Sequence, residues 1–257
     1  MKHSEYGDVS SNHVIVGVLG GMGPDATVAF MQQIIDVTPA EDDIDHIHLL
    51  VDNNPKVPSR IKALIDGGNE NPGPVIADMA RRLEHAGASF LVMPCNTAHY
   101  YWQYAQDAVD IPVWHIVELT LNFIARRIPR ARVGMLCSPA LRKIGLYEGF
   151  VDARGLSLVY PDDENSLLEV IRTVKRGEGQ HSDTFSAFSR AADDLEVCGA
   201  DVLVLACTEL SVIQGALDTS VPVVDTLQVL AQQVVMTAVG VDASELREQD
   251  PIGLFTG

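Results

Sequence analysis

Short apolar segments alternate with amphipathic segments along most of the chain. The run from Val14 to Leu19 is rich in β-branched residues and ends in glycines, which predicts a strand followed by a turn. Residues 22–36 carry Val28, Met31 and Ile35 at helical spacing, which predicts a helix with these side chains on its apolar face. The pattern continues through a strand, a helix and a strand, at residues 46–54, 74–87 and 88–95. This alternation predicts an α/β fold with mainly parallel sheets flanked by helices.

A long internal repeat divides the chain into two similar halves. In each half a Gly-Ala pair precedes a strand, and a Cys-x-Thr motif lies eight residues after the glycine, from Gly87 to Cys95 and from Gly199 to Cys207. A Val/Ile-Pro-Val run follows each copy. The first strand is also repeated, at residues 14–21 and 131–138. A repeat of more than a hundred residues indicates a duplicated domain, because solenoid units are only about 20 to 50 residues long.

The repeat predicts two α/β domains related by a pseudo-twofold axis. We assign residues 14–113 plus 222–257 to the first domain and residues 114–221 to the second, and we expect residues 1–13 to form a flexible tail. In parallel α/β sheets, ligands lie beyond the carboxyl ends of the strands. Two such halves that face each other would place one Cys-x-Thr loop on either side of a shared cleft between the domains.

Charge and composition exclude several classes of partner. The 257 residues include 18 Lys and Arg against 35 Asp and Glu, a formal net charge of −17, and no cluster of basic residues occurs. Nucleic acids and anionic membrane surfaces are therefore not expected as partners. No apolar stretch reaches the roughly 18 residues that span a bilayer, and the N-terminus is polar, so we expect a cytoplasmic protein. An acidic small molecule would need local cations and backbone N–H donors.

The four cysteines differ in their sequence context. They show no Cys-x-x-Cys spacing, so neither a metal site nor a disulfide framework is expected. Cys95 and Cys207 each end an apolar strand and begin a predicted helix, whose N-terminal N–H groups lower a thiol pKa and bind carboxylates. Their equivalence in the repeat favours a chemical role for both, whereas core packing is expected for Cys137 and Cys198.

Two opposed thiols can invert a stereocentre without a metal or an oxidant. One thiolate removes the proton from a carbon acid, and the opposite thiol delivers a proton to the other face. The carbanion needs stabilisation as its carboxylate gains enediolate character. Backbone N–H groups of the two cysteine loops and the side chains of Asn96, Thr97 and Thr208 are placed to provide it.

Four motifs, in this order and spacing, carry a resemblance to a known family: GGMGPDAT, NNPKVPSR, MPCNTAH and ACTE, at residues 20–27, 53–60, 93–99 and 206–209. They are similar to the aspartate/glutamate racemase superfamily, and most of all to its aspartate racemase branch, from about residue 14 to about residue 235. The resemblance implies a cofactor-independent mechanism with two cysteines, two α/β domains with the active site between them, and a homodimer.

The resemblance also implies roles for individual residues. Met22 and Gly23 belong to a loop that lines the substrate site, and Asn54 lies in the N-x-P-x-x-P-x-R segment that ends at Arg60. That arginine resembles the ligand of the substrate's side-chain carboxylate. Lys175 is the nearest match to a second cation for the same carboxylate. Two other cations are rivals for this role: Lys143 and Arg176.

Two further residues near the cysteines leave alternatives open. Glu209 stands where glutamate racemases have a histidine after the Cys-Thr pair, which favours the aspartate branch. Three roles fit this glutamate: acceptor of the Cys207 proton, support of a loop, or helix cap. His99 follows Cys95 by one helical turn, and it either tunes the thiol or has a purely structural role.

Together these features predict an amino-acid racemase that acts on aspartate, with glutamate as a second candidate substrate and no cofactor. Maleate isomerase and hydantoin racemase, which keep two cysteines, are the alternatives within the superfamily, whereas arylmalonate decarboxylase needs only one. A non-catalytic protein that closes two lobes on a small anion is an alternative of another class. Paired Cys-x-Thr loops have no use in such a protein, so catalysis is the favoured interpretation.

Overall fold

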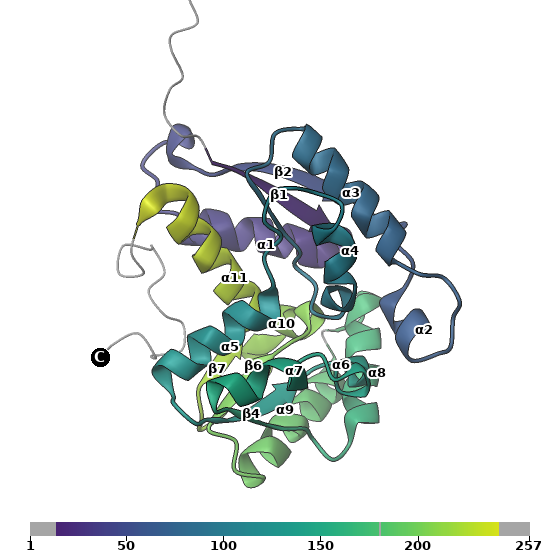
Figure 1. Ribbon diagram of the computed structural model, residues 1–257. Coiled ribbons are helices and arrows are strands. Elements are labelled where there is room, and N and C mark those ends of the chain that lie inside the picture. The colour runs from purple at the N-terminus through teal and green to yellow at the C-terminus, as the bar shows by residue number, and fades with distance from the viewer. Residues whose placement is uncertain (1–13, 180, 242–257) are drawn as a thin grey trace, which may run out of the picture.

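Two parallel β-sheets with helices on both faces form the computed structural model, which describes residues 14–179 and 181–241 (Figure 1). The first sheet has the order β2-β1-β3, with the bounds His48–Asn53, Ile15–Gly20 and Phe90–Val92. The second sheet has the order β5-β4-β6-β7, with the bounds Ser157–Val159, Arg132–Leu136, Val202–Leu205 and Val223–Asp225. All strand pairs are parallel. The expected α/β class, with parallel sheets flanked by helices, is confirmed.

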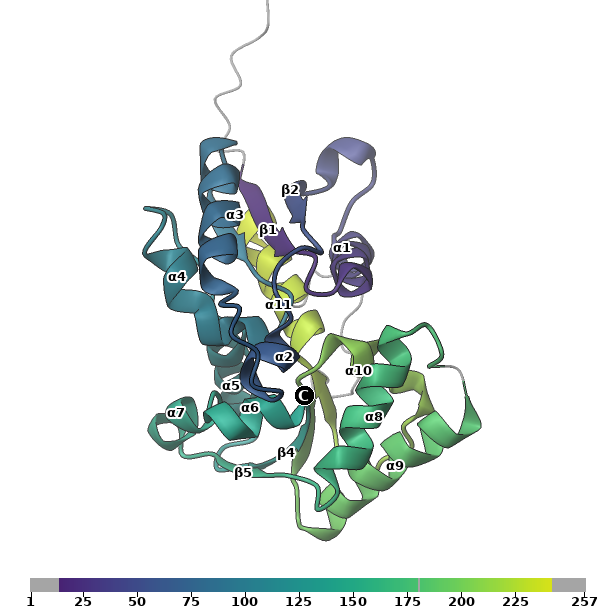
Figure 2. The same cartoon turned by 90° about the vertical axis from the view of Figure 1, so that its right-hand side faces the viewer.

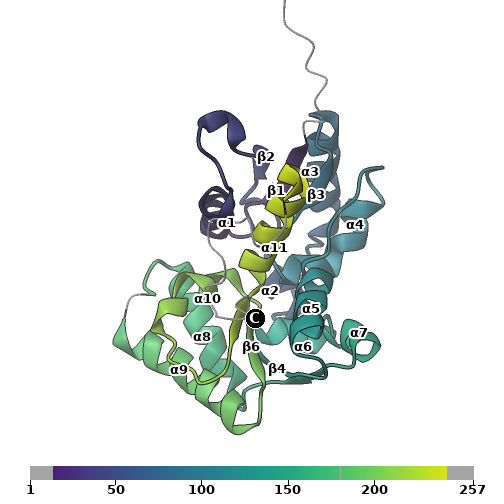
Figure 3. The same ribbon diagram turned by 90° about the vertical axis from the view of Figure 1, so that its left-hand side faces the viewer.

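The helices that cover the two sheets fall into three groups (Figures 2 and 3). α3 (Gly73–His85) and α4 (Trp102–Gln106) cover the outer face of the first sheet, and α8 (Glu164–Lys175) and α9 (Ser182–Val197) cover the outer face of the second. Three helices lie between the sheets: α1 (Pro24–Val37), α5 (Ile116–Arg127) and α11 (Thr226–Val235). The remaining short helices lie in loops: α2 (Arg60–Leu64), α6 (Pro139–Ile144), α7 (Glu148–Val151), α10 (Thr208–Val212), the 3-10 helices η1 (Asp43–Asp45), η2 (Thr97–Tyr101), η3 (Asp152–Arg154) and η4 (Gln214–Ala216), and the π-helical turn η5 (Met236–Gly240).

The repeat is visible in the packing of the two central strands. Gly17 on β1 and Gly134 on β4 are each covered so closely that an added Cβ would overlap the neighbouring leucine side chain. The same neighbours recur around each glycine: Leu83, Ala88 and Leu91 in the first half, and Leu195, Ala200 and Leu203 in the second. Close packing of helix and strand therefore requires glycine at the same place in both halves.

One continuous core joins the halves. Buried side chains of β1 and β3 pack through α1, α5 and α11 onto those of β4 and β6. A shared core of this kind resists relative motion, because close-packed interiors tolerate little displacement. The loops at the carboxyl ends of both sheets are thus held in a fixed relation. Within the described ranges, no helix is long and apolar enough to cross a membrane.

The apolar face of α1 differs from the face that the sequence pattern indicated. Val28 and Ile35 are 60% and 45% exposed, whereas the stripe of Phe30, Ile34 and Val37 is buried. Both stripes have helical spacing, so periodicity alone does not distinguish them. The position of α11 against α1 decides which stripe is covered.

The strand β7 corrects the predicted boundary at residue 222. Its residues pair with β6 in the second sheet, with Leu203 opposite Val223, so the strand belongs to the second half and not to the first. The reason lies in the repeat, since each Val/Ile-Pro-Val run lies beside the strand that leads to the cysteine of its own half, with Val113 in an isolated parallel bridge with Leu91 and Val223 at the start of β7. The backbone N–H of Leu91 donates to Pro112 and that of Leu203 to Pro222, both at 2.8 Å. The rest of the division stays a prediction, and the expected tail at 1–13 lies outside the described residues.

Candidate active site

Cys95 and Cys207 line one cavity between the two halves. Cys95 follows β3, where its backbone N–H donates to the Met93 carbonyl (2.8 Å), and Cys207 follows β6 at the N-terminus of α10. Because β3 and β6 have equivalent registers against β1 and β4, the two motifs leave their sheets at the same level. The same cavity is lined by other residues that the sequence singled out: Met22, Asn96, Thr97, Lys175, Thr208 and Glu209.

His99 holds the loop of Cys95 and does not contact the thiol. Its Nδ1–H donates to the Cys95 carbonyl (2.8 Å), and its Nε2 accepts from the backbone N–H of Ile116 (3.1 Å). These partners fix the neutral tautomer, because a carbonyl only accepts and an amide N–H only donates. Burial lowers the pKa of His99 to about 3. The structure therefore supports the structural role of this histidine. The Cys95 thiol itself lies 3.5 Å from the Thr97 hydroxyl.

Cys207 lies in a chain of charged contacts. Its thiol donates to Glu209 Oε2 (3.0 Å), and Glu209 Oε1 lies 3.3 Å from Lys175 Nζ. Burial, and after it the Glu209 carboxylate, raise the pKa of the Cys207 thiol well above its usual range, while Lys175 opposes the shift. Burial acts to lower the pKa of Lys175, but Glu209 and the two cysteines outweigh it and raise that pKa above its usual value. Cys207 is thus a thiol and Lys175 a cation at neutral pH.

A hydrogen bond from the position equivalent to His99 holds the loop of Cys207. Ser211 follows Cys207 by four residues, as His99 follows Cys95, and its hydroxyl donates to Asp225 Oδ1 (2.9 Å). Asp225 also accepts from the backbone N–H of Leu227 (2.9 Å) and so caps α11. Burial raises the pKa of Asp225 to about 6. Each cysteine loop is therefore anchored near the start of the helix that follows, at Ile116 on α5 and at Asp225, the N-cap of α11.

Arg60 lies in an adjoining cavity of about 580 Å³ and not in the cavity of the two thiols. It is the first residue of α2, whose N-cap Ser59 accepts from the backbone N–H of Lys62. Arg60 is only 9% exposed; its Nη1 donates to the carbonyls of Val57 (3.3 Å) and Pro58 (3.0 Å), and its Nε has no partner among the described residues. A buried guanidinium with a free donor is suited to bind a carboxylate.

Lys175, Thr208 and Glu209 form a wall shared by the two cavities. Gly23 lines the adjoining cavity beside them. Asn54 lines neither cavity, which differs from the role that the resemblance implied. Its side chain accepts from the backbone N–H of Lys56 (3.0 Å), and its backbone lies so close to Gly21, at φ +84°, that no side chain fits there. The backbone of Asn54 thus packs directly against the glycine loop at Gly21.

The rivals of Lys175 point elsewhere. Lys143 Nζ donates to the Ile65 carbonyl (3.4 Å), and Arg176 pairs with Glu178 (3.1 Å). Neither lines the two cavities, so Lys175 is the cation beside the thiols among the described residues.

Sequence reasoning missed four residues of the thiol cavity: Ile61, Ser138, Ile171 and Ala206. Ser138 carried a signal, because it closes the segment 131–138 that repeats the first strand and its glycine loop. It caps α6 by accepting from the backbone N–H of Ala140 (3.3 Å). Ile61 and Ile171 come from helices whose approach to the cavity no local pattern indicates.

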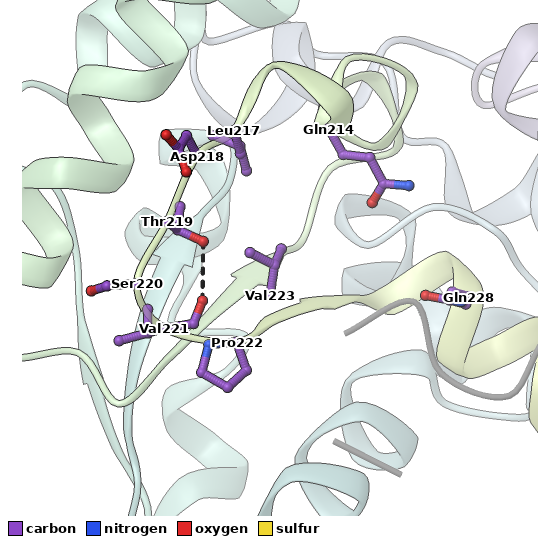
Figure 4. Close-up of a pocket in the computed structure, with 9 residues that line it drawn as sticks. All are labelled: Gln214, Leu217, Asp218, Thr219, Ser220, Val221, Pro222, Val223 and Gln228. Carbon is purple, nitrogen blue, oxygen red and sulfur yellow. Dashed lines mark hydrogen bonds between the residues drawn. The ribbon is translucent and has the colours of Figure 1, made fainter. Parts of the chain in front are cut away.

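A separate hollow lies beside β7 (Figure 4). It is formed by the loop around Asp218 and Pro222, where the Thr219 hydroxyl donates to the Val221 carbonyl (3.0 Å). It contains none of the residues predicted for the site, and Asp218 is the one charged side chain among the described residues that line it. Within residues 14–179 and 181–241, no group of three or more His, Cys, Asp or Glu is arranged to hold a metal ion.

Replacing Glu209 with glutamine is expected to lower the pKa of Cys207, because one of the two causes of its elevation is removed. At a fixed pH below that pKa, alkylation of Cys207 by iodoacetamide should become about tenfold faster for each unit by which the pKa falls. The rate is measured across a pH series by mass spectrometry of the Cys207 peptide. Glu169→Gln, an acid paired with Arg172 on the exposed side of α8, is the control. An unchanged or higher pKa in the Glu209 variant would contradict this role.

Comparison with known proteins agrees with this architecture. The sequence model of the Asp/Glu/Hydantoin racemase family matches residues 19–234. The chain belongs to this family of racemases, which are isomerases.

Individual relatives extend over nearly the whole chain. The broad specificity amino-acid racemase RacX of Bacillus subtilis (strain 168) is 28% identical over 228 residues, which cover 87% of this chain and 97% of the relative. Among solved structures, Picrophilus torridus aspartate racemase has a TM-score of 0.78 at 27% identity and covers 90% of this chain and 97% of its own. An aspartate racemase homologue from Pyrococcus horikoshii OT3, at 22% identity and a TM-score of 0.69, supports the fold alone; the match covers 88% of this chain and 99% of the homologue.

Proposed function

We propose that the protein inverts the Cα of aspartate, with Cys95 and Cys207 as the acid and base and with no cofactor. The observation that carries this proposal is that equivalent strand ends of the two halves bring both thiols to one cavity. Two thiols that enter one cavity from different halves match the need to remove a proton from one face of a carbon and return one to the other. The aspartate racemase among the structural neighbours supports the substrate.

The chemistry needs only proton transfers. The Cys95 thiolate takes the α-proton, and the electron pair of the broken C–H bond moves into the α-carboxylate, which becomes an enediolate. Backbone N–H groups and the hydroxyls of Thr97 and Thr208 stabilise this charge. The Cys207 thiol then gives its proton to the opposite face. Cys95 ends as the thiol and Cys207 as the thiolate, so the next turnover starts in the reverse direction.

The starting roles follow from the contacts of Cys207. Burial and Glu209 raise the pKa of this thiol, so it begins as the proton donor and Cys95 as the acceptor. When Cys207 has lost its proton, the charge of the thiolate is offset by Lys175, which interacts with both cysteines. Glu209 thereby favours the protonated form of Cys207 until the proton is transferred to the substrate.

Two cations are available to the distal carboxylate of the substrate. Lys175 lines the thiol cavity, and the buried Arg60 lies in the adjoining one. Glutamate is the second candidate substrate, because its longer side chain would carry the carboxylate past Lys175 towards Arg60. These two local charges allow an acidic amino acid to bind to a chain whose net charge is −17.

The test is an incubation of the purified protein with L-aspartate in deuterated buffer, without added pyridoxal phosphate. Loss of the Cα proton signal by NMR should accompany decay of the optical rotation to zero. Neither exchange nor inversion with aspartate or glutamate would contradict the proposal. Conversion of maleate or inversion of a hydantoin in parallel samples would identify the alternative activities, and binding without exchange would identify a protein that only binds anions.

A further inference from the structure

A buried chain of hydrogen bonds connects the loops of the two cysteines. The hydroxyl of Tyr147 donates to Asn96 Oδ1 (2.6 Å), Asn96 Nδ2 donates to the hydroxyl of Thr226 (2.9 Å), and that hydroxyl donates to the carbonyl of Leu205 (3.0 Å). We call these four groups the Thr226 bridge. Each donor has one acceptor, and the single proton of Thr226 goes to Leu205, so the direction of every bond is determined.

The bridge reaches both cysteines through the backbone. Asn96 follows Cys95 directly, and Leu205 precedes Cys207 by two residues. Thr226 is the first residue of α11, so one hydroxyl contacts both cysteine loops at the same time. Tyr147 and Leu205 belong to the second half and Asn96 to the first, which means that the bridge crosses between the halves.

Because the Thr226 bridge is buried, each of its polar groups needs a hydrogen-bond partner within the protein. Tyr147 and Thr226 are completely buried, and Asn96 is 2% exposed. Loss of the Thr226 hydroxyl would leave the Asn96 amide and the Leu205 carbonyl without their partner at a place that water does not readily reach. Buried polar groups that have lost a hydrogen-bond partner shift towards a new one, because an unsatisfied donor or acceptor costs free energy. The loops on either side would then lose their fixed spacing.

The bridge is not a by-product of the internal repeat. The equivalent of Thr226 in the first half is Ile116, which lies the same four residues after the proline of its Val/Ile-Pro-Val run. Ile116 has no hydroxyl, and its backbone N–H donates to His99 instead. The connection between the halves is therefore specific to one copy, where it serves both cysteines.

We propose that Thr226 is a positioning residue that sets the placement of the two thiols relative to each other, a role that rests on the racemase function proposed above. Inversion requires both thiols to reach one carbon from opposite faces. Exchange of the α-proton with return to the same face requires only one of them. Disturbing the bridge should therefore impair inversion more than exchange.

The test is Thr226→Val, which keeps the shape of the side chain and removes the hydroxyl. In deuterated buffer, inversion of aspartate should fall on the order of 10- to 100-fold, as expected for a small misplacement of reacting groups. Deuterium incorporation without inversion should persist, so the ratio of exchange to inversion rises several-fold, while KM for aspartate changes much less than kcat. Thr226→Ser, which restores the hydroxyl, should return the ratio close to that of the wild type.

Thr120→Val is the matched control. Thr120 on α5 is also completely buried, and its hydroxyl has no hydrogen-bond partner among the described residues, so the same substitution should leave the ratio unchanged. Tyr147→Phe provides a second variant if Thr226→Val fails to fold. It removes one outer bond of the bridge and should raise the ratio in the same direction by a smaller factor.

The outcomes separate the two proposals. A wild-type protein with neither exchange nor inversion would contradict the racemase function and this role with it. An active wild type together with an unchanged ratio in Thr226→Val, or in Tyr147→Phe where only that variant folds, would contradict the positioning role alone. A proportional loss of exchange and inversion in a folded Thr226 variant would also overturn it, because a general loss of structure or of substrate binding has that effect.

Discussion

Replacing either Cys95 or Cys207 with alanine is expected to lower the rate of aspartate inversion by about 10²- to 10⁴-fold, the usual contribution of one general acid or base. Each variant keeps one thiol, so it should still exchange the α-proton of a single enantiomer. Cys207→Ala retains the proposed starting base and should exchange the enantiomer whose proton faces Cys95. NMR with separate samples of L- and D-aspartate in deuterated buffer measures both rates and assigns each thiol to one face.

Cys137→Ala is the matched control for these variants. Cys137 is buried like Cys95 and follows β4 at the place that repeats the first glycine loop, but it does not line the thiol cavity. It should retain the inversion rate of the wild type. Inversion at the wild-type rate in either Cys95→Ala or Cys207→Ala would exclude a mechanism with two thiols.

The parts of this site that the sequence predicted are those that the repeat determines. Gly17 and Gly134 occupy equivalent places under their helices, and Cys95 and Cys207 leave their sheets at equivalent points. Strand periodicity and a fixed motif spacing are local properties, so the pairing of the two motifs could be inferred from the sequence alone. The boundary at residue 222 differs from the structure because β7 has only three residues, too few for a periodicity that would assign them to one sheet or the other.

Contacts across the halves could not be predicted in this way. Asn96 and Thr226 are 130 residues apart, and Asn96 and Tyr147 are 51 apart, so their meeting depends on how the two sheets pack. The same packing decides which stripe of α1 is buried. Lys175 was reached through resemblance alone, since nothing in the periodicity of α8 indicates that its last residue meets Glu209.

Under the proposed function, Lys175 and Glu209 would couple the charge of the substrate to the chemistry of the Cys207 thiol. One carboxylate oxygen of Glu209 accepts from Cys207 and the other faces Lys175. A substrate carboxylate that approaches Lys175 competes with Glu209 for the same cation. As Lys175 is drawn away, Glu209 becomes a stronger acceptor for the Cys207 proton. Binding of an acidic substrate would then raise the pKa of the Cys207 thiol.

Replacing Lys175 with methionine is accordingly expected to lower kcat/KM for aspartate by about 10- to 100-fold, because a hydrogen bond to a charged group is worth about 1.5–3 kcal/mol. Two causes act in the same direction. The distal carboxylate loses a partner, and the pKa of Cys207 rises further once the cation that opposes Glu209 is gone. Initial rates with both enantiomers and the inhibition constant of succinate, a dicarboxylate without an ammonium group, measure the effect.

The inhibition constant separates these two causes. Succinate binds without proton transfer, so a weaker inhibition reports the lost carboxylate contact alone, while the alkylation rate of Cys207 reports the thiol. Lys143→Met, which replaces a cation that is bonded to the Ile65 carbonyl and lines neither cavity, is the control and should leave both quantities unchanged. Unaltered succinate inhibition in Lys175→Met would show that Lys175 does not bind the distal carboxylate. Of the two cations proposed for this role, Arg60, which is buried with a free Nε among the described residues, would then remain.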